Sequence, residues 1–206
     1  MSSVILVVGL AKHSYQKDGY DIIGVDYGAY VCAKEHIVME YAIADFDSCT
    51  PQQMDEISKY TKKVIQLPSA KDETDTEYAT MFALRQGYDN IIIYGGLGGR
   101  LDHELANLAL LTRRRYPLTL VDDHNELCLL EEGVHHLQKH HQYISFLPLE
   151  KSNVSFKQLV YPLDHKDLDV KDIFTISNEF ESDQAIVEVH QGCLLCIQSS
   201  DLGSRL

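Results

Sequence analysis

Residues 95–103 read Gly95-Gly-Leu-Gly-Gly-Arg-Leu-Asp-His103, a run of four glycines followed by a cation and an acid. The preceding run, Asp89-Asn-Ile-Ile-Ile-Tyr94, is β-branched and short enough for a buried strand. From Leu101 to Thr112, apolar residues repeat at helical spacing. The glycines therefore fill a strand-to-helix turn, where backbone N–H groups can approach an oxyanion without a Cβ in the way.

Two interpretations of this turn are open. In the first, Arg100 and the turn bind phosphate oxygens, helped by the positive end of the helix dipole. In the second, the turn has no ligand, Arg100 is solvated, and Asp102 merely favours the helix N-terminus. Glycine-rich turns alone are weak evidence for a ligand, so the rest of the sheet edge has to decide.

Three earlier apolar segments, 21–25, 40–44 and 63–67, each run into a polar cluster and then a helical pattern. The clusters are Asp26-Tyr-Gly28, Asp45-Phe-Asp-Ser48 and Lys71-Asp-Glu-Thr-Asp75. If the strands are parallel, all these clusters and the glycine turn emerge at one carboxyl edge, where open α/β sheets bind ligands. Their shared position favours the phosphate interpretation.

The acidic clusters have both a functional and a structural explanation. Asp45 and Asp47 are spaced so that both carboxylates can reach one cation, and Asp75 or Asp72 could supply another ligand for Mg²⁺. Helix capping is the structural alternative. Its signals are Ser48 or Thr50 before Pro51, and Thr74-x-x-Glu77. Both explanations hold together, but capping leaves Asp45, Asp47 and Asp72 unexplained, whereas a bound metal would relieve their repulsion.

Composition limits the classes of partner. The 206 residues are 45% hydrophobic and carry a net charge of −13, which disfavours nonspecific binding to nucleic acid or to an anionic membrane. A phosphate ligand should therefore be small and arrive with a divalent metal. No segment is long enough to span a bilayer, and the apolar run from Val4 to Gly9 is interpreted as a first strand rather than a signal peptide.

Five cysteines at irregular spacing favour a reducing cytoplasm over a disulfide framework. Cys193 and Cys196 are separated by an odd number of positions in an expected strand. Their sulfurs should therefore lie on opposite faces, which argues against a shared zinc or redox role.

After about residue 117 the rhythm changes to short strands broken by turns. We therefore predict an α/β fold in two domains: a Rossmann-like domain with a mainly parallel sheet at 1–123, and an antiparallel β-sandwich at 124–206. The β segments expected after residue 125 include 126–130, 134–137, 143–147, 154–156, 158–161, 173–176, 185–189 and 193–197.

The ordered motifs resemble those of the thiamine pyrophosphokinase family, in its bacterial form. That family has a D-F-D-S turn, a K-D-x-T-D segment, a G-G-x-G-G-R-x-D-H helix entry with a following A-N, and a late S-N-E-F. The matching segments here are Asp45–Ser48, Lys71–Asp75, Gly95–His103, Ala106-Asn107 and Ser177–Phe180, in the same order. The resemblance spans nearly the whole chain.

The resemblance implies an enzyme that transfers pyrophosphate from MgATP to the hydroxyl of thiamine, giving thiamine diphosphate and AMP. It also implies a homodimer in which the β-sandwich domain binds thiamine at the subunit interface and makes the dimer contact. Positioning and charge neutralisation should dominate such a transfer.

The resemblance also implies roles for individual residues. Asp45, Asp47 and Asp75 are expected to bind Mg²⁺, with Asp72 as a further candidate. Lys71, Arg100 and the glycines Gly95, Gly96, Gly98 and Gly99 would hold the triphosphate. Asp102 and Asn107 would orient ATP or the reacting groups, and Asp26 and Thr74 complete the nucleotide-binding set. Ser177 and Asn178 of the other subunit would contact the thiamine pyrimidine. The chain has no tryptophan, so thiamine would either stack on another side chain, for which Phe180 is a candidate, or have no stacking partner.

Two other functions use the same motifs. A metal-dependent nucleotide phosphohydrolase would activate water in place of an alcohol. A noncatalytic ATP-binding sensor would bind ATP at the same edge without turnover. The number of carboxylates argues against a pure sensor, because binding ATP alone needs few of them.

Overall fold

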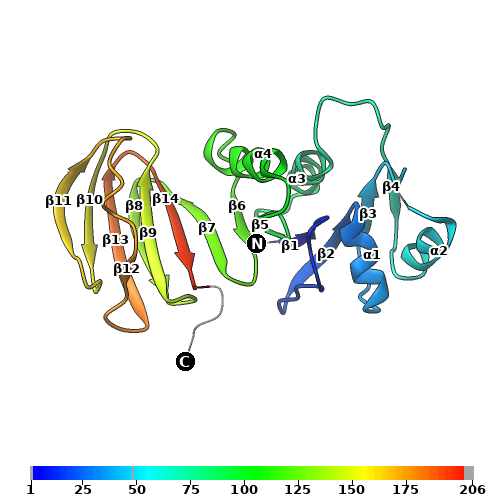
Figure 1. The fold of residues 1–206 in the computed structure, drawn as a ribbon, viewed down its shortest axis with the longest axis horizontal. Coiled ribbons are helices and arrows are strands. Elements are labelled where there is room, and N and C mark those ends of the chain that lie inside the picture. Colours follow the sequence, from blue (N-terminus) through cyan, green and yellow to red (C-terminus); the bar gives the residue numbers. More distant parts are fainter. Residues whose placement is uncertain (1, 48, 202–206) are drawn as a thin grey trace. The chain divides into compact units, whose positions relative to one another are not determined.

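The computed structural model describes residues 2–47 and 49–201, and the chain divides into two compact units. One unit runs to Leu110 and includes Tyr116–Asp122; the other consists of Leu111–Arg115 and the chain from Asp123 onward. Figure 1 shows their helices and strands.

The first unit is an α/β structure built on six parallel strands. Its strands are β1 (Ser3–Val7), β2 (Tyr20–Val25), β3 (Tyr41–Ala44), β4 (Val64–Gln66), β5 (Asn90–Tyr94) and β6 (Leu118–Val121). They lie in the order β6-β5-β1-β2-β3-β4, and every adjacent pair is parallel. The expectation of a mainly parallel sheet is therefore confirmed, and the carboxyl ends of its strands share one edge.

Four helices connect these strands: α1 (Tyr27–Lys34), α2 (Pro51–Lys59), α3 (Asp75–Arg85) and α4 (Leu101–Thr112). The start of α2 matches the expected cap. The Gln53 backbone N–H donates to Thr50 Oγ1 at 3.3 Å, the Thr50 N–H donates to Gln53 Oε1 at 2.8 Å, and Pro51 takes the first helical position. Ser48, the other candidate cap, lies outside the described residues.

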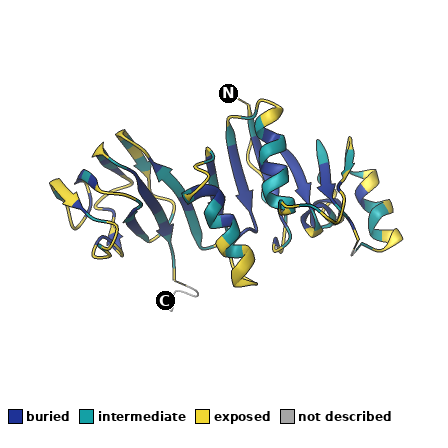
Figure 2. Ribbon diagram, turned by 90° about the horizontal axis from the view of Figure 1, so that it is seen from above, coloured by how far each residue is buried: buried dark blue, intermediate teal, exposed yellow. Residues whose placement is uncertain are grey.

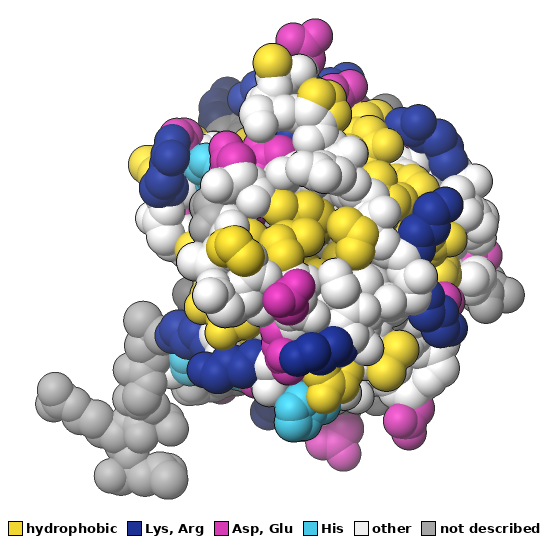
Figure 3. All heavy atoms as spheres, turned by 90° about the vertical axis from the view of Figure 1, so that its right-hand side faces the viewer, with side chains coloured by type: hydrophobic (Ala, Val, Ile, Leu, Met, Phe, Trp, Pro, Cys, Tyr) yellow, Lys and Arg dark blue, Asp and Glu magenta, His cyan; other side chains and the backbone are white. Residues whose placement is uncertain are grey.

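Most strands of this sheet are apolar runs whose side chains are buried, and they form the core of the unit. Figure 2 shows these strands in the colour of buried residues. Ile5 and Val7 of β1 pack with Ala29 and Cys32 of α1 and with Ile92 of β5. At the β4 and α2 side of the molecule, acidic and basic side chains are interspersed on the surface (Figure 3).

The second unit is an antiparallel β-sandwich. One sheet has the order β12-β9-β14-β7 and the other β11-β10-β13-β8. The strands are β7 (Asn125–Leu130), β8 (Gly133–Gln138), β9 (Tyr143–Pro148), β10 (Ser152–Lys157), β11 (Leu163–Leu168), β12 (Asn178–Glu179), β13 (Gln184–Gln191) and β14 (Leu194–Ser199). Phe146 of one sheet packs on Phe156 of the other, with ring centroids 4.4 Å apart. The predicted sandwich is confirmed.

Two of the expected strands in this unit are wrong. Residues 158–161 form only an isolated bridge from Leu159 to Phe180, and residues 173–176 form no strand. Two strands were missed: the two-residue β12, and β11, whose central residues are polar and exposed. β11 lies at a sheet edge, where charged side chains prevent further pairing and remove the apolar alternation that identifies buried strands.

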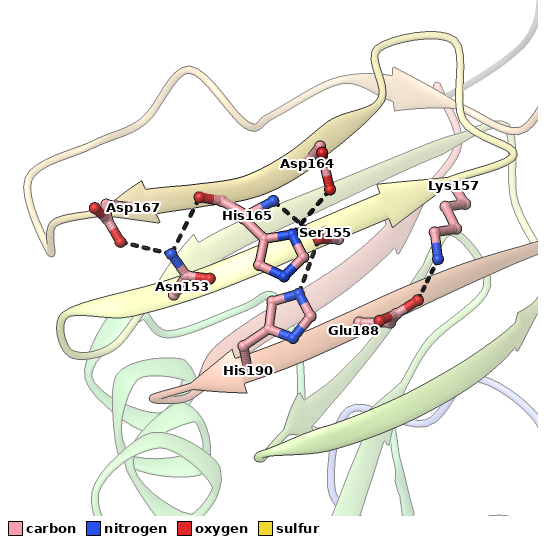
Figure 4. Close-up of polar contacts among 8 residues, drawn as sticks. All are labelled: Asn153, Ser155, Lys157, Asp164, His165, Asp167, Glu188 and His190. Carbon is pink, nitrogen blue, oxygen red and sulfur yellow. Dashed lines mark hydrogen bonds and ion pairs between the residues drawn. The ribbon is translucent and has the colours of Figure 1, made fainter.

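The outer face of the β11-β10-β13 sheet carries a polar network (Figure 4). The rings of His165 and His190 stack with centroids 4.3 Å apart, and His190 Nε2 lies 2.8 Å from Ser155 Oγ. Lys157 pairs with Glu188 across neighbouring strands. By contrast, several large apolar side chains are exposed to solvent between residues 160 and 176.

Among the described residues, no helix is both long and apolar enough to cross a membrane.

Candidate functional site

A cavity of about 410 Å³ opens at the carboxyl edge of the parallel sheet. It lies beyond the ends of β1, β2 and β5, where the strand order reverses direction around β1. Open α/β sheets bind ligands at this kind of switch point. Seven residues predicted from sequence line it: Asp26, Lys71, Thr74, Asp75, Gly95, Arg100 and Asn107.

The glycine turn is fixed by close backbone packing and by one buried side chain. Gly95 has φ +82°, and a Cβ there would lie 2.5 Å from the backbone nitrogen of Ala11. Asn107 is 8% exposed, and its Nδ2 donates to the carbonyl oxygen of Gly96 at 2.7 Å. Asn107 thus lines the cavity and also holds the turn in place. Gly96, Gly98 and Gly99 do not line the cavity.

The start of α3 brings a cation and an acid to the cavity wall. Thr74 caps the helix by accepting from the Glu77 N–H at 3.1 Å. Lys71 Nζ lies 2.7 Å from Asp75 Oδ1, and this close contact with the carboxylate raises the pKa of Lys71. Asp75 Oδ1 is buried. Its contact with Lys71 is an ion pair, and the oxygen has no hydrogen-bond partner among the described residues.

Asp26 is the acid whose surroundings are least favourable to its charge. Burial raises its pKa, and the negative charges of Asp75, Asp45 and Asp47 raise it further. Its φ of +52° is uncommon for a residue with a side chain. Such strain concentrates at functional sites, and Phe46, between Asp45 and Asp47, has a similar φ of +56°.

Asp45 and Asp47 lie on the loop after β3. The Asp47 N–H donates to Asp45 Oδ1 at 3.2 Å, so the two residues form a tight turn. Neither residue lines the cavity, although both carboxylates act electrostatically on Asp26 and Lys71. Asp72 is exposed and outside the lining. In residues 2–47 and 49–201, no three Asp, Glu, His or Cys side chains converge closely enough to form a metal site by themselves.

Arg100 and Asp102 form an exposed pair at the start of α4. Arg100 Nη2 lies 2.7 Å from Asp102 Oδ2, and Arg100 Nε lies 3.1 Å from Asp102 Oδ1. This bidentate contact lowers the pKa of Asp102 to about 2. Arg100 reaches the cavity, whereas Asp102 lies outside its lining. Asp102 therefore contacts the cavity's arginine and not the cavity itself.

Ser177 and Asn178 belong to the β-sandwich unit. Ser177 is exposed with φ +56°, and its N–H donates to Ser145 Oγ at 2.9 Å. Asn178 is 5% exposed, and its side chain accepts from the Tyr161 N–H and donates to the Tyr161 carbonyl. Phe180 is 7% exposed in the sandwich core, so the proposed stacking role for Phe180 is wrong.

Sequence reasoning missed part of the cavity wall. Gly9 and Leu10 follow β1, and the loop residue Ser69 and the helical His103 also line the cavity. The signal for Gly9 was present, because a glycine directly after the first buried strand marks the same carboxyl edge. Gly9 lies against Asp26, whose Oδ2 would be 3.5 Å from a Cβ at this position.

Family models match both units. The model described as thiamin pyrophosphokinase, catalytic domain, matches residues 13–120. The model described as thiamin pyrophosphokinase, vitamin B1 binding domain, matches residues 134–194.

Individual relatives agree with the family models. The chain is 31% identical over 186 residues to the thiamine pyrophosphokinase of Bacillus subtilis strain 168, which covers 87% of each protein. The crystal structure of a Bacillus subtilis thiamine pyrophosphokinase superposes with a TM-score of 0.87 at 30% identity, covering 98% of this chain and 100% of that one. A thiamin pyrophosphokinase family protein from Enterococcus faecalis gives a TM-score of 0.86 at 27% identity, with the same coverage.

Proposed function

Because the chain belongs to the thiamine pyrophosphokinase family, we propose that the cavity at the switch point of its parallel sheet holds the phosphates of ATP during pyrophosphate transfer. The protein is an enzyme of the thiamine diphosphokinase class, which uses ATP and thiamine. Neither a phosphohydrolase nor a sensor is supported by the comparisons. The observation that carries the proposal is the meeting of Lys71, Arg100 and acidic side chains at one sheet edge.

In the proposed complex the triphosphate lies along the glycine turn. Gly95 has no side chain, which leaves room for the phosphates at the cavity wall. The starts of α3 and α4 offer N–H groups to phosphate oxygens. Arg100 is exposed, so the guanidinium N–H groups that do not contact Asp102 can bind phosphate oxygens. Lys71 supplies a second positive charge, and Thr74 and Asn107 keep the two walls in place. Gly96, Gly98 and Gly99 shape the turn.

The acidic residues fit a divalent cation. Burial raises the pKa of Asp26, and the negative charges of Asp75, Asp45 and Asp47 raise it further, so a cation would offset this repulsion. We assign Asp45, Asp47 and Asp75 to Mg²⁺ or its bound waters, with Asp72 at the periphery. When bound, Mg²⁺ neutralises phosphate charge.

In the transfer itself, the thiamine hydroxyl oxygen attacks the β-phosphorus of ATP and its proton is released to solvent. The bond from that phosphorus to the oxygen shared with the α-phosphorus breaks, and AMP leaves with that oxygen. The side chains of the cavity contribute by position and charge: Lys71 and Arg100 hold phosphate oxygens, and Asp102 holds Arg100 in orientation.

We propose that the sandwich unit contributes the thiamine contact through Ser177 of the partner copy. Ser177 has a left-handed backbone conformation and is exposed to solvent. The buried side chain of Asn178 makes two hydrogen bonds to the backbone of Tyr161 and so holds it in place. Tyr161 is 67% exposed, so its ring is available for stacking where Phe180 is not. Tyr161→Leu should raise the KM for thiamine more than the KM for ATP.

A homodimer would bring these parts together. Residues 160–176 of the sandwich expose several large apolar side chains, which is unusual for a monomer surface. They are Val160, Tyr161, Val170, Ile173, Phe174 and Ile176. A second copy of the chain is the proposed occupant of this surface. Sedimentation velocity of Ile173→Glu and of the wild-type protein tests this proposal. We expect the variant to shift toward monomer relative to the wild-type dimer. A variant that is as dimeric as the wild type would remove residue 173 from the interface.

We also propose that the enzyme acts in the cytoplasm, because five cysteines, odd in number and irregularly spaced, suit a reducing compartment.

Incubation with MgATP and thiamine, followed by identification of the nucleotide product, tests the proposed reaction. AMP should appear in equal amount with thiamine diphosphate. ADP with thiamine monophosphate would indicate an ordinary kinase, and nucleotide hydrolysis without thiamine would indicate a phosphohydrolase. Asp47→Asn should abolish transfer with an unchanged melting curve. The control is Asp55→Asn, which neutralises an exposed acid on α2; normal activity of Asp47→Asn would remove Asp47 from the site.

A further inference from the structure

Two cysteines face each other across neighbouring strands of the sandwich. Cys128 in β7 lies directly opposite Cys196 in antiparallel β14. Both belong to the same hydrophobic core, with Leu130 and Leu194 as the next facing pair on that side of the sheet. The two sulfurs therefore lie on one face, and they come from strands that the sheet already holds together.

The spacing of such a pair suits a disulfide. Directly opposed residues of an antiparallel pair have Cα atoms about 4.5–5.5 Å apart, depending on their hydrogen-bonding position. A disulfide requires a Cα separation of about 4.4–6.8 Å. The two thiols are also within hydrogen-bonding reach of each other. Closing the bond therefore needs side-chain rotation and no new strand pairing.

The two thiols have different surroundings. Cys196 is 2% exposed, and the hydrogen bond to Cys128 together with burial raises its pKa well above the usual value. Cys128 is partly exposed, and the hydrogen bond from Cys196 lowers its pKa. The next facing pair toward the polar end of these strands is Glu126 and Gln198. Cys128 is thus the thiol that a small polar oxidant reaches first.

We propose that Cys128 and Cys196 form a reversible disulfide site for which hydrogen peroxide is the oxidant. The Cys128 sulfur attacks one peroxide oxygen, the O–O bond breaks, and Cys128 becomes a sulfenic acid with release of water. The Cys196 sulfur then attacks the Cys128 sulfur, the S–O bond breaks, and a second water leaves with the Cys196 proton. Two thiols are oxidised and one peroxide is reduced. The inference rests on the sandwich unit alone and stands independently of the proposed ATP site.

The experiment treats the full-length protein with hydrogen peroxide, alkylates the remaining thiols, and maps peptides without reduction. We expect one intramolecular link between the peptides of Cys128 and Cys196, a mass loss of two hydrogens, and full reversal by dithiothreitol. Cys32, Cys49 and Cys193 should remain unlinked. A linkage involving any other cysteine as the main product, or oxidation of Cys128 to sulfinic acid without a link, would overturn the proposal.

Variants separate the two roles. Cys128→Ser should leave Cys196 reduced under the same peroxide treatment, whereas Cys196→Ser should let Cys128 proceed to sulfinic acid. Cys193→Ser is the matched control, because it removes a buried thiol next to β14 that has no proposed partner role, and it should leave the link unchanged. Retention of the link-specific mass loss in Cys128→Ser would refute the assignment. Peptide mapping of the wild-type chain decides the question even if a variant fails to fold.

Discussion

Gly95 and Gly98 offer a matched test of whether the cavity depends on close backbone approach. Both adopt nearly the same left-handed conformation, with φ +82° and +81°. A Cβ at Gly98 would meet nothing within 4 Å, whereas a Cβ at Gly95 would lie 2.5 Å from Ala11 N and 2.8 Å from Ala11 Cα. Alanine in this conformation costs roughly 1–2 kcal/mol. Overpacking against the backbone adds roughly 1–3 kcal/mol at Gly95 alone.

We therefore expect Gly98→Ala to lower the free energy of unfolding by roughly 1–2 kcal/mol and Gly95→Ala by roughly 2–5 kcal/mol. Urea unfolding followed by circular dichroism measures both, since the chain has no tryptophan for fluorescence. Gly95 lines the cavity and Gly98 does not, so only Gly95→Ala should also weaken ATP binding. Equal losses of stability in the two variants would refute the packing argument.

Three further substitutions test the cavity. Asp26→Asn should abolish transfer yet raise stability at neutral pH. The folded pKa of Asp26 lies above its ordinary value, so its contribution to stability is present at low pH and lost as pH rises through the folded pKa. The gain in the free energy of unfolding, measured with urea, should therefore shrink as the pH is lowered toward the ordinary pKa of a carboxyl group. A gain that does not change with pH would contradict this origin. Asn107→Leu should cost about 1–3 kcal/mol because the buried Gly96 carbonyl loses its donor. Unchanged stability and an unchanged KM for ATP would contradict that role. Arg100→Gln should raise the KM for ATP, while Arg113→Gln, also exposed, should not; equal effects would argue against a specific phosphate contact.

The sequence was sufficient to predict the parallel sheet because most of its strands are short apolar runs followed by polar or glycine-rich turn residues. Such runs are typical of strands buried on both faces. The edge strand Leu163–Leu168 gave no such signal, since its charged side chains face solvent. Conversely, the apolar segment 173–176 resembled a strand, but its side chains Ile173, Phe174 and Ile176 are exposed on a connection.

For the candidate site, the sequence predicted which residues share the sheet edge but not which of them face the cavity. Asp26 and Asp75 line it, whereas Asp45 and Asp47 act from the neighbouring loop. The difference depends on side-chain direction at loop positions, which spacing does not encode. The pairing of Cys128 with Cys196 was also invisible, because it depends on the register of two distant strands.

The strained positions connect the fold to the proposed chemistry. Asp26, Phe46 and Ser177 all have positive φ, a conformation that costs free energy for residues with a side chain. Regular structure holds two of them: the Asp26 N–H donates to Ile43 O of β3, and the Ser177 N–H donates to Ser145 Oγ of β9. The sheets thus stabilise conformations that aim polar groups at their edges. The same sheet also keeps Asp26 close to other acids, so removal of its charge should stabilise the fold and inactivate the enzyme. This combination is expected at a position where function, and not stability, determines which residue is present.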